Sequence, residues 1–268
     1  MSVSPSTSHR DQAGFDPSPA AARLAQAYRD HSLLTALAPE IRPVGLDQAY
    51  AVQSALREAL GEDVAGYKVA AANVAALRLS EFGLPLFGYM ARSRMHGSDV
   101  ALPVPVGAPY MLEVEVALEI AGDVQPATTA LNVQTMIAGA HLAIEVVRSR
   151  YVDRTVVGAS SFVADDSAFH AFVQGDRLSQ GVDPAVWTGS EAQLLFNGES
   201  ITTPLSGETC TEPLTSLELF WTHAARHGLT LKRGQLITTG TLVKPVDVSA
   251  PGRYEGRLGH ARVGFSIV

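Results

Sequence analysis

The spacing of apolar and polar residues divides the chain into a short helical beginning and a longer strand-rich remainder. Near the N-terminus apolar side chains recur every three or four positions, as Ala49, Val52, Leu56 and Leu60 do. After Gly61 short apolar runs are separated by Gly, Pro and Asp, which is typical of strands. The predicted helices cover residues 19–37, 46–60 and 214–227, and the first predicted strands cover residues 64–70, 111–120 and 142–147.

The C-terminal segment predicts further strands, joined by turns into a meander. Its apolar runs are residues 235–238, 246–248 and 263–268, and its turn signals are Gly240 and residues 251–252 and 256–259. Two helices followed by many short strands and one later helix indicate an α+β chain with antiparallel or mixed sheet. The predicted divisions are a flexible leader at residues 1–18, an N-terminal helical part at residues 19–62 and a main domain at residues 63–268.

Composition and charge narrow the possible functions. The chain has 268 residues, of which 46% are hydrophobic and 18% charged, and its formal net charge is -7. No basic surface is predicted, so a nucleic-acid partner is not expected. Residues 1–18 lack the apolar core of a secretory signal, and later apolar runs are shorter than the roughly 20 residues that span a bilayer. The single cysteine, Cys210, suits a reducing compartment, and the cytoplasm is the predicted location.

Strict alternation of apolar residues with Glu predicts one acidic strand at residues 111–120. It places Glu113, Glu115 and Glu119 on one face and apolar side chains on the other. Neighbouring carboxylates on that face start about 7 Å apart, so two of them can converge on one cation. The alternative interpretation is a half-exposed strand with a solvated acidic face.

Glu145 adds a third carboxylate within an apolar run, residues 142–147. Apolar neighbours on both sides predict burial, and a buried carboxylate needs a cation or a basic partner. Arg148 or Arg150 could supply a structural ion pair instead of a metal. Three carboxylates without a thiolate favour a hard cation, Mg²⁺ or Mn²⁺.

Two further segments could hold an anionic substrate. Lys68 lies in an apolar strand, where it should face a carboxylate, although a surface lysine with a buried stem is the alternative. Residues 236–242 run from a strand into a turn at Gly240, which offers backbone N–H groups and hydroxyls. Ordinary turn chemistry explains that segment equally well.

Together these motifs resemble the 2-keto-4-pentenoate hydratase and 4-oxalocrotonate decarboxylase group of the fumarylacetoacetate hydrolase (FAH) superfamily. The likeness runs from residue 46 to the final strand, and the Glu-x-Glu with a third Glu 30 residues later is its most specific mark. The motifs that carry it are Gly66-Tyr-Lys-Val69, Glu113-Val-Glu115, Ile144-Glu-Val-Val147, Ser149-Arg-Tyr151, Val163-Ala-Asp165 and Thr239-Gly240.

The resemblance implies an FAH-like mixed β-sheet roll with a small N-terminal helical part, and homo-oligomers. It implies Mg²⁺ bound by Glu113, Glu115 and Glu145, with the substrate's carboxylate and 2-oxo oxygens completing the coordination. Lys68 would hold the substrate carboxylate or stabilise the enol oxygen. Thr241, together with Gly240, would contact the same end of the substrate.

Two positions depart from the family pattern, and both are ones the family uses for proton transfer or for placing water. Leu86-Phe-Gly-Tyr89 replaces the usual Leu-Phe-x-Asp, and Ala164-Asp-Asp166-Ser-Ala168 replaces Ala-Asp-Asn followed by Ser. Tyrosine can donate a proton but is a poor base at neutral pH. Tyr89 and Asp166 are therefore the candidates for proton transfer.

The function expected from the resemblance is a hydro-lyase. It would add water to a 2-hydroxy-2,4-dienoate to give a 4-hydroxy-2-oxo acid, as in the degradation of aromatic rings. One alternative keeps the same metal and decarboxylates or hydrolyses a 2-oxo acid, with Tyr89 as proton donor. Another is a catalytically silent homologue that binds 2-oxo acids or serves as a partner subunit.

Overall fold

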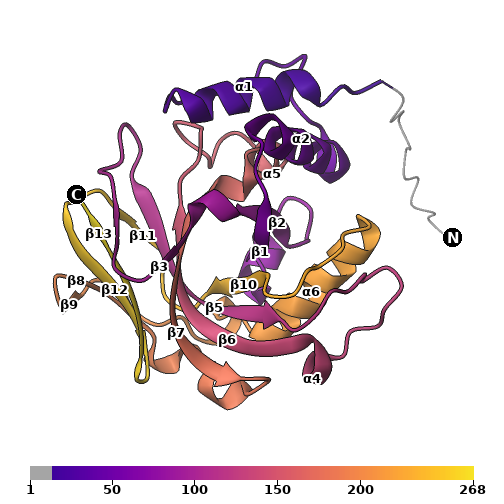
Figure 1. The fold of residues 1–268 in the computed structure, drawn as a ribbon. Coiled ribbons are helices and arrows are strands. Elements are labelled where there is room, and N and C mark those ends of the chain that lie inside the picture. The colour runs from indigo at the N-terminus through magenta and orange to yellow at the C-terminus, as the bar shows by residue number, and fades with distance from the viewer. Residues whose placement is uncertain (1–13) are drawn as a thin grey trace, which may run out of the picture.

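A computed structural model describes residues 14–268 as six α-helices and thirteen strands (Figure 1). Residues 1–13 of the predicted leader lie outside the described residues, and Ser18 already belongs to the first helix. The helices are α1 (Ser18–Arg29), α2 (Gly45–Leu60), α3 (Val74–Leu79), α4 (Val133–Met136), α5 (Ala159–Ala164) and α6 (Pro213–Arg226). The strands are β1 (Val64–Ala70), β2 (Leu86–Ala91), β3 (Met95–Gly97), β4 (Val100–Leu102), β5 (Tyr110–Ile120), β6 (Ile137–Val147), β7 (Phe169–Gln180), β8 (Gln193–Phe196), β9 (Glu199–Ser200), β10 (Leu236–Thr241), β11 (Val246–Val248), β12 (Gly252–Leu258) and β13 (Ala261–Ile267).

The helix boundaries follow local signals where the sequence supplies them. Helix α2 ends at Gly61, which has φ 67°, and α6 begins where the Glu212 side chain accepts a hydrogen bond from the Thr215 N–H. The prediction that the first helix reaches residue 37 is wrong. It ends at Arg29, and Leu34 instead pairs with Tyr151 in an isolated β-bridge. No helix within residues 14–268 is long and apolar enough to cross a bilayer.

The strands form two sheets, and the larger one curls. Its eight strands run in the order β2-β1-β10-β5-β6-β7-β3, with β11 added alongside β5. The long strands β5, β6 and β7 bend strongly, and α1 and α2 lie across the top of the sheet (Figure 1). The predicted α+β class, a mixed β-sheet roll with a small N-terminal helical part, is confirmed.

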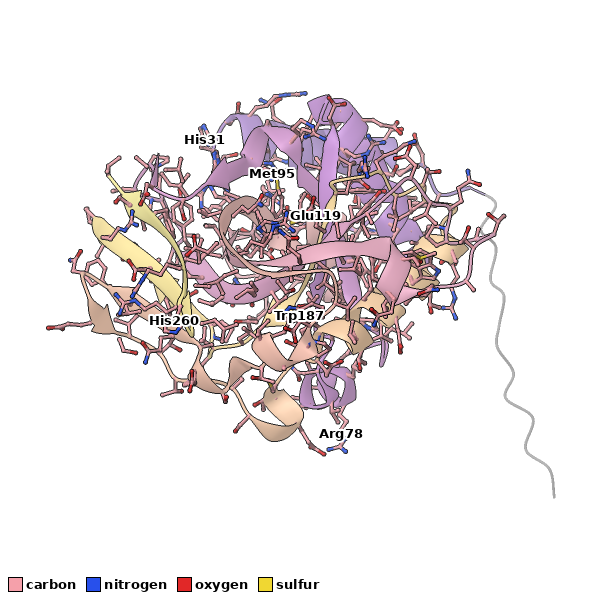
Figure 2. All side chains as sticks on the ribbon, turned by 60° about the horizontal axis from the view of Figure 1, so that its bottom comes forward. His31, Arg78, Met95, Glu119, Trp187 and His260 are labelled. Carbon is pink, nitrogen blue, oxygen red and sulfur yellow. The ribbon has the colours of Figure 1, made fainter. Side chains whose placement is uncertain are left out.

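The smaller sheet packs against the outer face of the roll. Its five strands run in the order β4-β13-β12-β8-β9. Trp187, Tyr254 and Phe265 are buried and belong to one hydrophobic core cluster with Val114 and Val116 of β5. Figure 2 draws the side chains on the ribbon and labels Trp187. This packing fixes the apolar face of β5 outward, so its acidic face must point into the roll.

The predicted C-terminal meander is wrong. Strand β10 enters the large sheet between β1 and β5, whereas β12 and β13 form a hairpin in the smaller sheet. Gly240 does not form a turn. It lies inside β10 with φ 90°, where the pairing with β5 shifts between Thr238 and Thr241. Turn signals locate the ends of strands, but they do not say which sheet each strand joins.

Candidate active site

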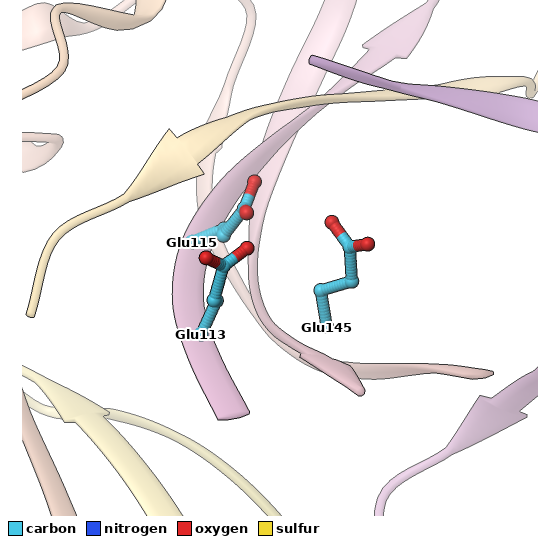
Figure 3. Close-up of side chains that lie close together, drawn as sticks. All are labelled: Glu113, Glu115 and Glu145. Atoms are coloured by element: carbon cyan, nitrogen blue, oxygen red, sulfur yellow. The ribbon is translucent and has the colours of Figure 1, made fainter. Parts of the chain in front are cut away.

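Three glutamates meet inside the roll. Glu113 on β5 and Glu145 on β6 are directly opposed in the ladder, and Glu115 follows on the same face of β5. One carboxylate oxygen from each lies within 4.8 Å of the others (Figure 3). Glu115 and Glu145 are fully buried and Glu113 is partly exposed. The structure therefore brings together the three carboxylates singled out in the sequence.

Glu119 shares their face but belongs to a different cluster. Its Oε2 accepts a hydrogen bond from Arg177 Nη2 at 2.7 Å and lies 3.4 Å from His141 Nε2. The arginine and histidine outweigh partial burial and lower the pKa of Glu119. The alternative of a solvated acidic face is wrong for this strand, because Glu115 is buried and Glu119 is paired.

Lys68 reaches into the carboxylate cluster from β1. Its Nζ forms an ion pair with Glu145 Oε1 and donates to the carbonyl oxygen of Ser167 at 3.1 Å. Only 2% of the residue is exposed, so the alternative of a surface lysine is wrong. Arg148 and Arg150, the other candidate partners of Glu145, donate to other groups.

Burial and mutual repulsion hold protons on this cluster. Burial raises the pKa of Glu145 to about 7, an effect that Lys68 reduces and Glu113 increases. Burial, Glu145 and Glu113 raise the pKa of Glu115 well above its ordinary value. Attraction to the carboxylates raises the pKa of Lys68 although burial lowers it. When all groups are ionised, three negative charges and one positive charge leave a net charge that one divalent cation neutralises.

Two buried oxygens support a cation at this point. Glu115 Oε1 and Glu145 Oε2 have no hydrogen-bond partner within residues 14–268, and such atoms are costly unless something else pairs with them. An all-carboxylate donor set fits a hard ion such as Mg²⁺ or Mn²⁺. The residues present therefore fit the metal implied by the sequence.

Gly240 and Thr241 lie beside Glu115, with their polar groups turned toward the protein. The Gly240 N–H donates to Glu115 Oε2 at 2.9 Å, and so positions that carboxylate. Thr241 is opposite Glu115 in the ladder, and its hydroxyl donates to the Val243 carbonyl at 2.9 Å. Contact of either residue with a substrate stays a prediction.

Tyr89 does not reach the cluster. In the pairing of β1 with β2, Lys68 is opposite Gly88 whereas Tyr89 is opposite Tyr67, so the Tyr89 ring is on the other face of the sheet. That ring lies 5.6 Å from the ring of Tyr67 and 5.5 Å from the guanidinium carbon of Arg57. Burial raises the pKa of Tyr89, which makes it a weaker acid. The structure removes the geometric basis for Tyr89 as the proton donor.

Asp166 lies on the side of β2 that faces Lys68. Its Oδ1 accepts the Tyr89 backbone N–H at 2.7 Å, and its Oδ2 is 3.8 Å from Arg94 Nη2. Burial raises the pKa of Asp166 to about 7, although Arg94 lowers it. A buried carboxyl that titrates near neutral pH can both give and take a proton, which keeps Asp166 a candidate for proton transfer.

Sequence reasoning assigned no role to Gly88 or Ser167, which together bring Asp166 and Lys68 close. Residues 166–168 have φ values of 54°, 48° and 60°, a left-handed turn that points the Ser167 carbonyl at Lys68. A Cβ on Gly88 would lie 2.8 Å from the Asp166 carbonyl oxygen and 3.0 Å from Lys68 Cγ. The only sequence signal was a glycine inside an apolar strand.

Curated relatives carry the names that the motifs suggested. No protein-family model matches the chain. It is 29% identical over 256 residues to the 2-keto-4-pentenoate hydratase of Paraburkholderia phymatum, which covers 92% of this chain and 96% of that protein. It is 26% identical over 241 residues to the 2-hydroxyhexa-2,4-dienoate hydratase of Comamonas testosteroni, which covers 87% of this chain and 90% of that protein.

A solved structure shares the fold. The 4-oxalocrotonate decarboxylase from Pseudomonas putida G7, complexed with magnesium and adipate, matches with a TM-score of 0.80 and 19% identity. The match covers 94% of this chain and 97% of that one. The family resemblance inferred from the motifs is therefore confirmed in both sequence and fold.

Proposed function

We propose that this relative of the 2-keto-4-pentenoate hydratases is a Mg²⁺-dependent hydro-lyase. It adds water to 2-hydroxy-2,4-dienoates to give 4-hydroxy-2-oxo acids. The names of its relatives support the reaction class. The observation that carries the proposal is the convergence of Glu113, Glu115 and Glu145 in a largely buried cluster with two unpaired oxygens.

The three glutamates would hold the cation. When bound, Mg²⁺ acts as a Lewis acid for the negative charge that develops on the substrate's 2-oxo oxygen. Glu115 is held for this role by the Gly240 N–H, and Glu145 by Lys68. Mn²⁺ has the same ligand preference and is the alternative ion.

Lys68 and Asp166 supply the remaining chemistry. An ammonium has three donors, and Glu145 and the Ser167 carbonyl occupy two of them, so one is left for an anionic substrate oxygen. The pKa of Asp166, about 7, suits a group that returns its proton within each turnover. Asp166 would thus take the part that the sequence assigned to Tyr89.

The substrate would be a small 2-oxo acid of aromatic-ring catabolism. The remaining parts of the proposal are a homo-oligomer in the cytoplasm, with neither nucleic acid nor membrane as a partner. The net charge of -7 and the single cysteine support the choice of compartment and the absence of nucleic acid.

The direct test supplies 2-hydroxypenta-2,4-dienoate with Mg²⁺ and then with EDTA, and identifies the products by NMR. We expect 4-hydroxy-2-oxopentanoate in the first sample and none in the second. Full turnover in EDTA would overturn the metal requirement. Oxalocrotonate and oxaloacetate, assayed alongside, report decarboxylation, and loss of CO₂ without hydration would replace the hydratase assignment. Absence of any turnover would favour a silent homologue.

Matched variants test the ligand set separately from turnover. Glu113→Ala and Glu145→Ala should each abolish Mg²⁺ binding in isothermal titration calorimetry, because each removes a ligand. Glu119→Ala should bind Mg²⁺ like the unmodified protein, since Glu119 is on the same face but paired with Arg177. Loss of binding in Glu119→Ala alone would show that the wrong carboxylates were chosen.

A further inference from the structure

A cavity lined by basic residues lies where residues 31–34, after α1, run beside residues 148–152. Its volume is about 40 Å³, and one water needs roughly 10–15 Å³ of such space. Two arginines and two histidines line it, and none of its lining residues is acidic: Arg148, Arg150, His31 and His170. His31, labelled in Figure 2, is exposed, so the cavity opens to solvent on that side.

Only one of these four basic residues has an acidic partner within residues 14–268. Arg150 forms an ion pair with Asp165. No Asp or Glu oxygen of the described chain lies within 4.0 Å of a nitrogen of the other three: Arg148, His31 and His170. The positive charge around the cavity therefore exceeds the negative charge that the protein supplies there.

Arg148 has hydrogen-bond donors to spare. It is half-buried, and its Nη2 donates to the Val106 carbonyl. Its Nε is buried and has no hydrogen-bond partner within residues 14–268. A guanidinium carries five N–H donors in a planar fork, and a buried donor without an acceptor is costly. Burial and the nearby Arg150 lower the pKa of Arg148, so an anion beside it would stabilise its charge.

His170 is the second unpaired group, and its surroundings are positive. Its ring stacks on Tyr110 with centroids 5.0 Å apart, and its ring nitrogens form no hydrogen bond with another described residue. Burial lowers the pKa of His170 to about 3. The neighbouring charges that lower it further are all positive: Arg150, Arg148, Arg94 and His31. A neutral imidazole keeps one N–H, which can donate to an anion.

We propose that this cavity is a binding site for a small oxyanion, either inorganic phosphate or the carboxylate of a small acid. The free N–H groups of Arg148 would bind the anion oxygens, since a guanidinium matches such oxygens in a planar fork. His170 and the hydroxyl of Ser32, which also lines the cavity, would donate to it as well. The glutamates of the metal site do not line this cavity, and the inference does not depend on the proposed function.

A bound anion would steady the turn at residues 166–168. The Arg150 N–H donates to Asp165 Oδ2 at 2.9 Å, and Arg150 Nη1 donates to the Phe169 carbonyl at 3.0 Å. Arg150 thus holds the chain on both sides of that turn. Arg148 repels Arg150 across the cavity, and an anion between two cations removes such repulsion. Occupation of the site should therefore stabilise the folded protein.

The test adds sodium phosphate to the metal-free, full-length protein, with sodium chloride of equal ionic strength as the control. Metal-free protein is used so that phosphate cannot bind to Mg²⁺ on the glutamates. We expect calorimetry to show one phosphate per chain. We also expect a higher urea midpoint in phosphate than in chloride.

Matched variants locate the bound anion. Arg148→Met should weaken phosphate binding about tenfold or more, the usual effect of losing hydrogen bonds to a charged group. His170→Phe keeps a ring on Tyr110 and should weaken binding by a smaller factor; it also carries the test if Arg148→Met does not fold. Arg23→Met removes an exposed arginine of α1 and should bind phosphate like the unmodified protein.

The outcomes decide whether the site exists and which anion it prefers. Equal urea midpoints in phosphate and chloride, or no heat of phosphate or acetate binding, would overturn the site. Binding that survives both Arg148→Met and His170→Phe would also overturn it, because the anion would then lie elsewhere. Acetate, added in the same way, separates the two sources: tighter binding of acetate supports a carboxylate ligand, and tighter binding of phosphate supports a tetrahedral one. Failure of the hydratase assay leaves all these results unaffected.

Discussion

Removal of the Lys68 charge should destabilise the metal-free protein and make it depend on Mg²⁺. Lys68→Met keeps most of the buried stem and deletes the ammonium that pairs with Glu145. The variant therefore leaves the three clustered carboxylates, of which Glu115 and Glu145 are fully buried, without a protein cation. It also leaves the Ser167 carbonyl without the donor that lies 3.1 Å away.

The magnitude follows from burial. Loss of one partner from a fully buried ion pair costs about 3–5 kcal/mol of unfolding free energy. Glu145 can limit this cost by holding a proton, because Lys68 is what lowers its pKa toward about 7. When folding raises the pKa of a carboxyl, the bound proton stabilises the folded protein. This stabilisation is fully present below the pKa in the unfolded state and is lost as pH rises through the pKa in the folded state. Above pH 7 only Lys68→Met keeps the proton on Glu145. Its loss of unfolding free energy relative to the unmodified protein, called the deficit below, should therefore grow by about 1.4 kcal/mol per pH unit.

Urea unfolding at pH 6 and pH 8, in EDTA and in saturating Mg²⁺, measures the unfolding free energy of Lys68→Met and of the unmodified protein. The deficit of Lys68→Met in EDTA should be larger at pH 8. A cation at 100 times its Kd adds about 2.7 kcal/mol to stability. At one fixed Mg²⁺ concentration the gain should be larger in the variant, because no lysine opposes Mg²⁺ and its Kd should be lower. Lys232→Met removes an exposed lysine paired with Asp123 and should change stability by less than about 1 kcal/mol.

Equal Mg²⁺ gains in the variant and the unmodified protein would refute the reasoning, because they would show that Lys68 and the cation do not share the same carboxylates. A deficit that is the same at pH 6 and pH 8 would refute the assignment of the proton to Glu145. A deficit no larger than that of Lys232→Met would refute the burial argument.

Three further predictions concern the same region. Because the pKa of metal-free Glu145 is raised to about 7, Mg²⁺ should bind more weakly as pH falls below 7. Calorimetry in buffers of different ionisation enthalpy should detect the proton released on Mg²⁺ binding. Binding without proton release would mean that the carboxylates are already ionised. Gly88→Ala should lower stability by about 1–3 kcal/mol in urea unfolding and reduce turnover, because its Cβ would lie 2.8 Å from the Asp166 carbonyl oxygen; an unchanged urea midpoint would contradict this tight packing. Tyr89→Phe should keep most of the activity, since its ring is on the face of the sheet away from Lys68, whereas a loss of a hundredfold or more in kcat would restore Tyr89 as proton donor.

Local sequence signals predicted the elements with short-range causes. The ends of α2 and α6 follow from their apolar spacing and from Gly61 and Pro213. The first helix was predicted too long because the apolar Leu34 continues its spacing, although Leu34 pairs with Tyr151 far along the chain. The predicted meander failed for the same reason, since strand pairing is not a local property.

The sequence by itself determined that Glu113 and Glu115 share one face and that Glu145 is buried, because alternation along a strand and apolar neighbours are local properties. Only the tertiary structure decided which side chains lie beside these glutamates. In the sheet, β10 and β5 separate β1 from β6, so Lys68 meets Glu145 only because the sheet curls. The register of β1 against β2 places Tyr89 on the opposite face. Side-chain direction repeats every two residues, but curl and register depend on how the whole chain packs.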